Sequence, residues 1–558
     1  MPNKLKELLK NRAVDISISF VLGIGVFFFW LEGFPQAMSY QEQYQLFLWT
    51  GDYFSESMRL PGGLARYVGE FLTQFYYVEW LGALILAFVF VAFHAVASLC
   101  LRQALKGYAA SVALIPVVLL LMMMGDECVL LSYPVALIVA MAVALILGKA
   151  NWLVDLAVVP LLFWLVGPAV WLYVALRGAV LGVKKYGWLA LPALYLFLVQ
   201  ELSYHFLLQQ WSLAEALLGM NYMRFPEYDR WQIVYVPAAI AALVWVSKAI
   251  AVKETKMVLS LVLCCAICVG GWFAISNAYD KGKYELIKQD YLIRNERWND
   301  IVANAERYTV PVNFWSESVN LALAMNHDLA NRQFSFFQSG VDALLMPMMR
   351  DLTSNLPTME AFFRLGLVNE SMRYAFDLQE SIPNGKKSGR LTKRIVECCI
   401  INGKYDVARK HINLLKKSLF YSEWAKDAES YLGNEAWINA HPQWGKLRQL
   451  RYKDDFLFYY GEKDKILGNL FINNTDNKMA LEYFMGELLL RGDIQMFQQG
   501  LGWAQQYGGY ASMPAGYQDA MRCIQAGGEV FDNRYSDYAK RMKHMMDPRM
   551  NIEEESVH

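Results

Sequence analysis

The chain has 558 residues, of which 56% are hydrophobic, 14% aromatic and 19% charged. Soluble domains are typically about 45–50% apolar and roughly 25% charged, so the apolar excess indicates segments that water does not reach. Lysine plus arginine and aspartate plus glutamate balance at 52 each, which excludes the basic excess typical of nucleic-acid binding. Eight cysteines are too sparse for a disulfide scaffold. These numbers point to an integral membrane protein that carries a soluble part.

Long apolar runs recur before residue 278, each near the roughly 20 residues that cross a bilayer. They predict nine membrane spans, at about 14–32, 77–101, 109–124, 129–148, 151–166, 168–183, 187–208, 232–250 and 256–277. Only Gly167-Pro168 separates the fifth from the sixth, so that stretch is either a tight hairpin or one long kinked helix. We therefore expect an all-α fold. It comprises a polytopic transmembrane domain over 1–278, with a large outer loop at 35–76, and a second domain over 279–558.

Charge asymmetry predicts the orientation of the membrane domain. With nine spans and a cytoplasmic N-terminus, 13 lysines and arginines fall on inside segments and 4 on outside segments. This is the direction of the positive-inside rule. An eight-span arrangement would instead place the C-terminal half in the cytoplasm. The charge count favours nine spans and a C-terminal half outside the cytoplasm.

The C-terminal half has a helical pattern with a weak internal repeat. Gly403-Lys404-Tyr405-Asp406-Val407-Ala408 resembles the middle of a tetratricopeptide repeat (TPR), and looser copies occur at Glu296-Arg297-Trp298 and Arg491-Gly492-Asp493. Stacked pairs of such helices form a solenoid with a concave surface. We expect this surface to bind a protein or glycan acceptor, and the alternative is a rigid lid or spacer on the membrane domain.

The first outer loop is long, rich in aromatic residues and amphipathic in two pieces, which predicts helices lying along the membrane surface. Its carboxylates include Glu42, Asp52 and Glu70, and its basic residues are Arg59 and Arg66. A carboxylate just outside the membrane can act as a general base on an acceptor hydroxyl or hold a divalent cation. An arginine can bind a phosphate with two parallel hydrogen bonds, or it can pair with a carboxylate four residues away on the same helix.

This loop and the topology resemble those of the polytopic GT-C glycosyltransferases, which take sugars from polyprenyl-phosphate carriers. Glu42 in Tyr40-Gln41-Glu42-Gln43-Tyr44 would correspond to the family's early acidic residue, which is typically an Asp or an Asp-Glu pair. Pro61-Gly62-Gly63-Leu64 would correspond to the turn before the second span, and Glu70 to the helix that leads into it. The chain also resembles uncharacterised membrane proteins of Bacteroidota, which implies a bacterial inner membrane and a periplasmic C-terminal domain.

The resemblance implies transfer of a sugar from a polyprenyl-phosphate-linked donor to an acceptor outside the cytoplasm. Glu42 and Asp52 are the catalytic candidates, as base or as ligands of Mg²⁺ or Mn²⁺, and Arg59 and Arg66 are candidates to bind the donor phosphate. Glu70 and further outer-face polar residues would support them. These are Asp126 and Glu127 after the third span, Glu201 and His205 four apart near the end of the seventh, and Arg224 in the loop beyond.

Two other functional classes remain possible on the sequence. The first is a non-enzymatic scaffold, whose TPR-like repeats recruit partners to an envelope complex. The second is a transporter, which is disfavoured because the spans lack the broken helix pairs and buried ionisable residues typical of ion coupling. The chain also lacks a glycine-rich phosphate loop with its lysine, so nucleotide-driven transport by this chain alone is not expected.

Overall fold

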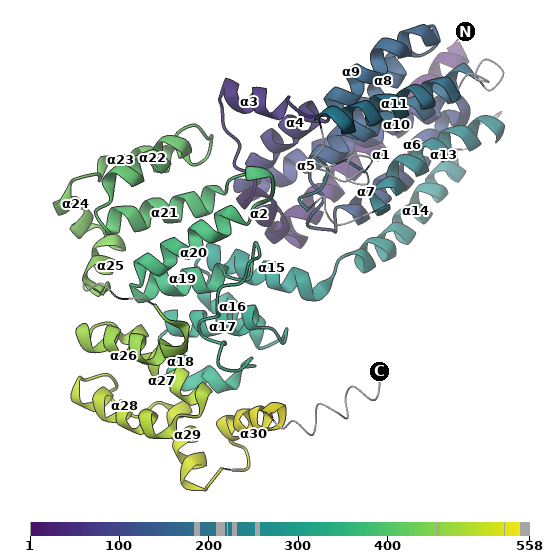
Figure 1. The fold of residues 1–558 in the computed structure, drawn as a ribbon. Helices are drawn as coiled ribbons and strands as arrows, with labels where there is room; N and C mark the ends of the chain where they lie inside the picture. The colour runs from purple at the N-terminus through teal and green to yellow at the C-terminus, as the bar shows by residue number, and fades with distance from the viewer. Residues whose placement is uncertain are drawn as a thin grey trace. The chain divides into compact units, whose positions relative to one another are not determined.

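The computed structural model describes residues 2–182, 190–207, 218–219, 221–225, 231–250, 257–452, 456, 458–528 and 530–546. Its regular elements over these ranges are helices, and the only β-pairing there is an isolated bridge between Val129 and Met223. The predicted all-α fold is confirmed (Figure 1). The chain forms two compact units. Unit 1 comprises Met1–Lys281 with Lys417–Phe420, and unit 2 comprises Gly282–Lys416 with Tyr421–His558.

Unit 1 contains the apolar helices. In chain order they and their connecting helices are α1 (Pro2–Phe28), α2 (Pro35–Gln43), α3 (Gly51–Ser57), α4 (Gly63–Thr73), α5 (Glu79–Leu105), α6 (Ala109–Val112), α7 (Leu114–Met123), α8 (Ser132–Leu147), α9 (Asp155–Val166), α10 (Val170–Leu181), α11 (Ala190–Leu207), α13 (Tyr235–Ile250) and α14 (Met257–Ala278). Among the described residues, five helical stretches are long and apolar enough to cross a membrane: Val14–Gly33, Glu79–Val112, Trp152–Leu181, Gln232–Ile250 and Met257–Ala278. Two shorter apolar helices are Leu114–Met123 and Ser132–Leu147. A membrane protein is therefore supported, while the count of nine spans stays a prediction. The end of the predicted span 168–183, part of 187–208 and the start of 256–277 lie outside the described residues.

The stretch Trp152–Leu181 folds back on itself at Gly167. Arg177 Nε lies 3.0 Å from Asp155 Oδ1, although the two residues are 22 positions apart. A straight helix of that length would separate them by about 33 Å. Gly167 has a φ of 73°, a conformation that glycine adopts without the steric cost of a Cβ atom, and Pro168 follows it at the start of the next helical turn. Of the two arrangements that the sequence leaves open, the tight hairpin is the one present.

Small residues allow helices of unit 1 to approach closely. A Cβ atom on Gly69 of α4 would lie 2.6 Å from the backbone nitrogen of Ser132, at the start of α8. A Cβ atom on Gly23 of α1 would lie 3.1 Å from Val91 Cγ2 of α5. These contacts hold α4 against α8 and α1 against α5.

Unit 2 consists of short amphipathic helices that pack mainly against their neighbours in sequence. They are α15 (Lys281–Arg294), α16 (Trp298–Ala305), α17 (Asn313–Met325), α18 (Leu329–Arg332), α19 (Leu356–Leu365), α20 (Val368–Glu380), α21 (Gly389–Ile401), α22 (Tyr405–Leu415), α23 (Ser422–Ser430), α24 (Glu435–Ala440), α25 (Trp444–Leu450), α26 (Lys463–Asn473), α27 (Lys478–Arg491), α28 (Ile494–Gln506), α29 (Ala515–Gln525) and α30 (Arg534–Met546). Extensive pairings include α19 with α20, α20 with α21, α21 with α22, and α26 with α27.

In the described part of unit 2, the same turn ends seven helices. Its central residue has a positive φ, and the next amide donates to the carbonyl five positions earlier, as Lys404 N does to Cys399 O at 2.8 Å. This is the Schellman motif, which satisfies carbonyls that a helix end leaves open. The central residues are Glu296, His327, Gly366, Gly403, Gly492, Gly508 and Gly527. The three sequence copies noted above fall on turns of this set, and the likeness to tetratricopeptide repeats stays a prediction.

Candidate functional site

Three segments far apart in the sequence meet around Gln41 on α2. Gln41 Nε2 donates to the carbonyl oxygens of Glu127, at 2.6 Å, and Val129, at 3.2 Å. Its Oε1 accepts a hydrogen bond from Arg224 Nη2 at 2.9 Å. The bridge between Val129 and Met223 joins the second and third segments directly. We call the side chains gathered here the Gln41 cluster: Tyr40, Gln41, Tyr44, Asp126, Glu127, Cys128 and Arg224.

Arg224 is the buried cation of the Gln41 cluster, with 5% of its surface exposed. Its guanidinium carbon lies 4.8 Å from the ring centroids of both Tyr40 and Tyr44, within the range of cation–π attraction. Nη2 bonds to Gln41, whereas Nη1 is buried and has no hydrogen-bond acceptor within the part of the chain that the structure describes. A buried charged donor without an acceptor costs free energy. An anionic oxygen placed beside Nη1 would remove that cost.

The turn after α7 supplies the acidic side of the cluster. One ligand atom from each of Asp126, Glu127 and Cys128 lies within 4.8 Å of the others, close enough to surround a metal ion. Asp126 Oδ1 accepts from the Cys128 amide at 3.0 Å, and the Cys128 thiol donates to Glu127 Oε1 at 3.5 Å. Carboxylate oxygens suit Mg²⁺ and Mn²⁺, whereas a thiolate suits softer metals. The two carboxylates are therefore the groups that fit the predicted cation.

The two catalytic candidates differ in their surroundings. Glu42 lies in the last turn of α2, directly after Gln41, and is 4% exposed. Asp52 is exposed in the first turn of α3, where the Thr50 side chain accepts a hydrogen bond from Tyr53 N at 3.2 Å. A carboxylate in the first turn of a helix complements the helix dipole, so the position of Asp52 already has a structural explanation. Glu42 belongs to the helix that builds the Gln41 cluster.

The predicted phosphate-binding arginines do not join this cluster. Arg66 Nε bonds to Glu70 Oε1 at 3.1 Å, one helical turn further along α4, and the Tyr53 hydroxyl donates to the other oxygen of Glu70. Burial and the charge of Glu70 raise the pKa of Tyr53 well above its usual value. Burial lowers the pKa of Arg66, but Glu70 more than compensates and the pKa is raised overall. Arg66 thus forms the helical ion pair considered as its alternative role, while Arg59 is exposed.

The predicted pair on α11 forms. His205 Nε2 lies 3.6 Å from Glu201 Oε2, and the side chains are 67% and 28% exposed. Four-residue spacing on a helix brings such side chains together. Their exposure places them on the surface of α11 rather than in the packed interior of unit 1.

Sequence reasoning missed Gln41, Tyr40, Tyr44 and Cys128 as parts of the site. Tyr40 and Tyr44 are four residues apart on α2, and their ring centroids lie 5.2 Å apart. That spacing was a usable signal, because it places two aromatic rings on one helix face. Nothing in the spacing of Gln41 indicates that it bonds to two distant segments.

Comparison with known proteins gives a family but no function. The model of DUF6057, a family of unknown function, matches residues 11–550, so the chain belongs to this family. No curated protein and no solved structure matches the chain significantly.

Proposed function

We propose that this protein is a membrane glycosyltransferase of the GT-C type, which transfers a sugar from a polyprenyl-phosphate-linked donor to an acceptor outside the cytoplasm. The observation that supports this most is the buried Arg224, whose Nη1 has no acceptor among the described residues, while carboxylates belong to the same cluster. A guanidinium with an open N–H is suited to a phosphate oxygen. We assign donor-phosphate binding to Arg224 in place of Arg59 and Arg66.

In this proposal the acceptor hydroxyl attacks the anomeric carbon of the sugar, and the bond from that carbon to the phosphate oxygen breaks. Glu42 takes the hydroxyl proton as general base, and polyprenyl phosphate leaves. Arg224 donates to the departing phosphate and neutralises its charge. Asp126 and Glu127 would hold a divalent cation, Mg²⁺ or Mn²⁺, which supplies further charge neutralisation. Asp52, exposed on α3, has no direct part.

The proposal includes the finer topology that the sequence suggests. Nine spans would place the N-terminus in the cytoplasm, and the Gln41 cluster and unit 2 in the periplasm of a bacterial inner membrane. A TPR-like stack in unit 2 would then present the acceptor, a glycan, lipid or protein, on the side where the sugar is transferred.

The test uses the full chain in lipid nanodiscs. Farnesyl phosphate binding is measured by calorimetry. Release of polyprenyl phosphate from a polyprenyl-phosphate hexose is measured with membrane extract as the acceptor source.

Arg224→Gln is expected to weaken farnesyl phosphate binding at least tenfold, because a hydrogen bond to a charged group contributes about 1.5–3 kcal/mol. Glu42→Gln is expected to bind farnesyl phosphate as wild type does but to release no polyprenyl phosphate from the donor. The matched control, Arg59→Gln, removes an exposed arginine and is expected to change neither. Equal binding by wild type and Arg224→Gln would refute the phosphate assignment.

A second candidate function is a membrane-anchored scaffold, favoured by the recurrence of one turn in unit 2. Repeated helix pairs are a common basis for partner binding. A scaffold predicts that Glu42→Gln and Arg224→Gln leave cellular function intact. It also predicts that charge reversals on the exposed face of α22, such as Lys410→Glu, abolish co-purification of a partner.

A further inference from the structure

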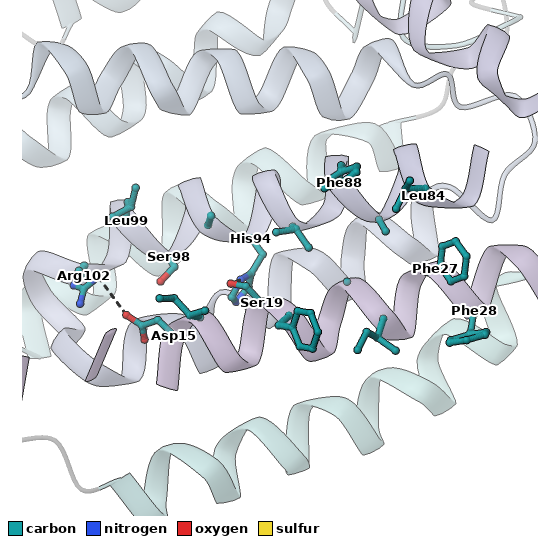
Figure 2. Close-up of a pocket in the computed structure, with 17 residues that line it drawn as sticks. Asp15, Ser19, Phe27, Phe28, Leu84, Phe88, His94, Ser98, Leu99 and Arg102 are labelled. Carbon is teal, nitrogen blue, oxygen red and sulfur yellow. Dashed lines mark hydrogen bonds and ion pairs between the residues drawn. The ribbon is translucent and has the colours of Figure 1, made fainter. Parts of the chain in front are cut away.

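A groove with a volume of about 710 Å³ runs along unit 1 between α1 and α5 (Figure 2). This volume is within the range of about 300–1,000 Å³ typical of small-molecule sites. Phe20, Ile24, Phe28, Phe88 and Leu99 line it, and each is between 45% and 68% exposed. Both helices belong to stretches long and apolar enough to cross a membrane. The groove is therefore an apolar surface of the kind that lipid contacts.

The polar groups of the groove are concentrated toward one end. Figure 2 shows Asp15 and Arg102 joined at that end, with Phe27 and Phe28 at the other. Arg102 Nη1 lies 3.2 Å from Asp15 Oδ2, and the side chains are 33% and 17% exposed. Asp15 is the only ionic partner described for Arg102 among the residues that the structure covers. The end of the groove thus presents one partly exposed cation beside one partly exposed anion.

A second polar pair, Ser19 and His94, lies between the two ends of the groove, and both ring nitrogens of His94 are already hydrogen-bonded. Ser19 Oγ lies 3.0 Å from His94 Nδ1, and His94 Nε2 lies 2.8 Å from the Ala110 carbonyl oxygen. That carbonyl only accepts, so Nε2 carries the proton and Nδ1 accepts from the serine hydroxyl. His94 has no donor left for a ligand, and it is 1% exposed. Among the described residues that line the groove, recognition by charge therefore falls to Asp15 and Arg102.

The length of the groove matches one acyl chain of one leaflet. From Asp15 to Phe28, α1 rises by about 20 Å, and half of the hydrocarbon core is about 15 Å thick. A chain lying in the groove would begin at the ion pair and end beside Phe27 and Phe28, tilted by about 40° to stay within one leaflet. Its head group would then meet Asp15 and Arg102 together.

We infer that this groove binds a phosphatidylethanolamine molecule, with its phosphate on Arg102, its primary ammonium on Asp15 and one acyl chain between α1 and α5. Charge complementarity selects this lipid. An anionic phosphatidylglycerol offers its phosphate to Arg102 but only neutral hydroxyls, and no cation, to Asp15. The quaternary ammonium of phosphatidylcholine cannot donate a hydrogen bond to a carboxylate. The ethanolamine head group satisfies both residues.

The test is native mass spectrometry of the full chain, mixed with phosphatidylethanolamine, phosphatidylcholine or phosphatidylglycerol that carry identical acyl chains. For wild type we expect phosphatidylethanolamine to bind about fivefold more tightly than the other two, which corresponds to one partly exposed charge-assisted hydrogen bond. Asp15→Asn is expected to remove this preference while phosphatidylcholine binding is retained. Arg102→Gln is expected to weaken all three lipids about fivefold. These two variants give different patterns, so general misfolding would not reproduce both.

A second pair of variants tests the apolar part. Ala95→Phe fills the groove and should weaken phosphatidylethanolamine binding, because Ala95 lines it. Val258→Phe, on the exposed surface of α14, is the matched control and should leave phosphatidylethanolamine binding unchanged. Equal binding of the three lipids, tightest binding of phosphatidylglycerol, equal effects of the two phenylalanine variants, or an Arg102→Gln protein that binds like wild type would overturn the inference.

Discussion

Replacing Glu482 by glutamine is expected to change how the stability of unit 2 depends on pH. Glu482 lies on α27 and is 5% exposed, and its Oε2 has no hydrogen-bond partner in the described part of the chain. Burial, with a smaller effect from the nearby charge of Asp328, raises the pKa of Glu482 from 4.5 to about 8. The folded chain therefore holds this proton at neutral pH, whereas the unfolded chain releases it.

The sign of the effect follows from this difference. A carboxyl group whose pKa is higher in the folded state favours folding most below its unfolded pKa, and this contribution is lost as the pH rises toward the folded pKa. With pKa values of 4.5 and about 8, the loss is about 3 kcal/mol by pH 7 and about 4 kcal/mol by pH 8, at 1.36 kcal/mol per pKa unit. Glutamine does not titrate, so the variant escapes this loss.

The assay is denaturant unfolding of the full chain in nanodiscs, followed by tryptophan fluorescence from pH 4.5 to 8.5. The free energy of unfolding of Glu482→Gln, minus that of wild type, is expected to increase with pH and to level off above about pH 8. Gln498→Ala, an exposed and non-titrating change in the same unit, is the control and should show no such trend. A difference that stays constant with pH would refute the reasoning.

Two further predictions concern the packing of unit 1. Arg177→Met leaves Asp155 buried without its cation and should lower the free energy of unfolding in detergent by about 3–5 kcal/mol. Adding Asp155→Leu to this variant should recover part of the lost stability. If the losses from the two substitutions simply add, the ion-pair explanation is wrong. Gly69→Ala places a methyl group against the Ser132 backbone and should destabilise by about 1–3 kcal/mol despite the better helix propensity of alanine. Gly25→Ala, which meets nothing within 4 Å, should not destabilise the chain, and an equal loss at both glycines would contradict the steric explanation.

The sequence predicts those features that depend on local pattern. Apolar runs long enough to cross a membrane predict the helices of unit 1, and Gly403 and Gly492 mark helix ends because glycine adopts a positive φ readily. The turns at Glu296 and His327 have the same geometry without glycine, and only Glu296 falls in one of the looser repeat copies of the sequence. A non-glycine residue in this conformation gives no compositional signal.

The candidate site depends on long-range contacts, which the sequence does not display. The sequence singles out Asp126, Glu127 and Arg224 individually. It does not show that a backbone bridge joins their two segments, or that the amide of the neutral residue Gln41 bonds to both. The helical spacing of Arg66 and Glu70 fits either an ion pair or two separate roles, and the ion pair formed. Burial of Glu42 and exposure of Asp52 also follow from packing that a single sequence does not reveal.

The hairpin of α9 and α10 has a consequence for how the protein is made. An arginine near the middle of a single inserted helix costs about 2.5–3.5 kcal/mol at the translocon. Arg177 avoids this cost only after Asp155 and the carbonyls of Gly148 and Ala150 surround it. These partners emerge from the ribosome first. We therefore expect α9 to enter the bilayer only after α10 has been synthesised. The two helices of the hairpin would then insert together, with Asp155 and Arg177 already paired.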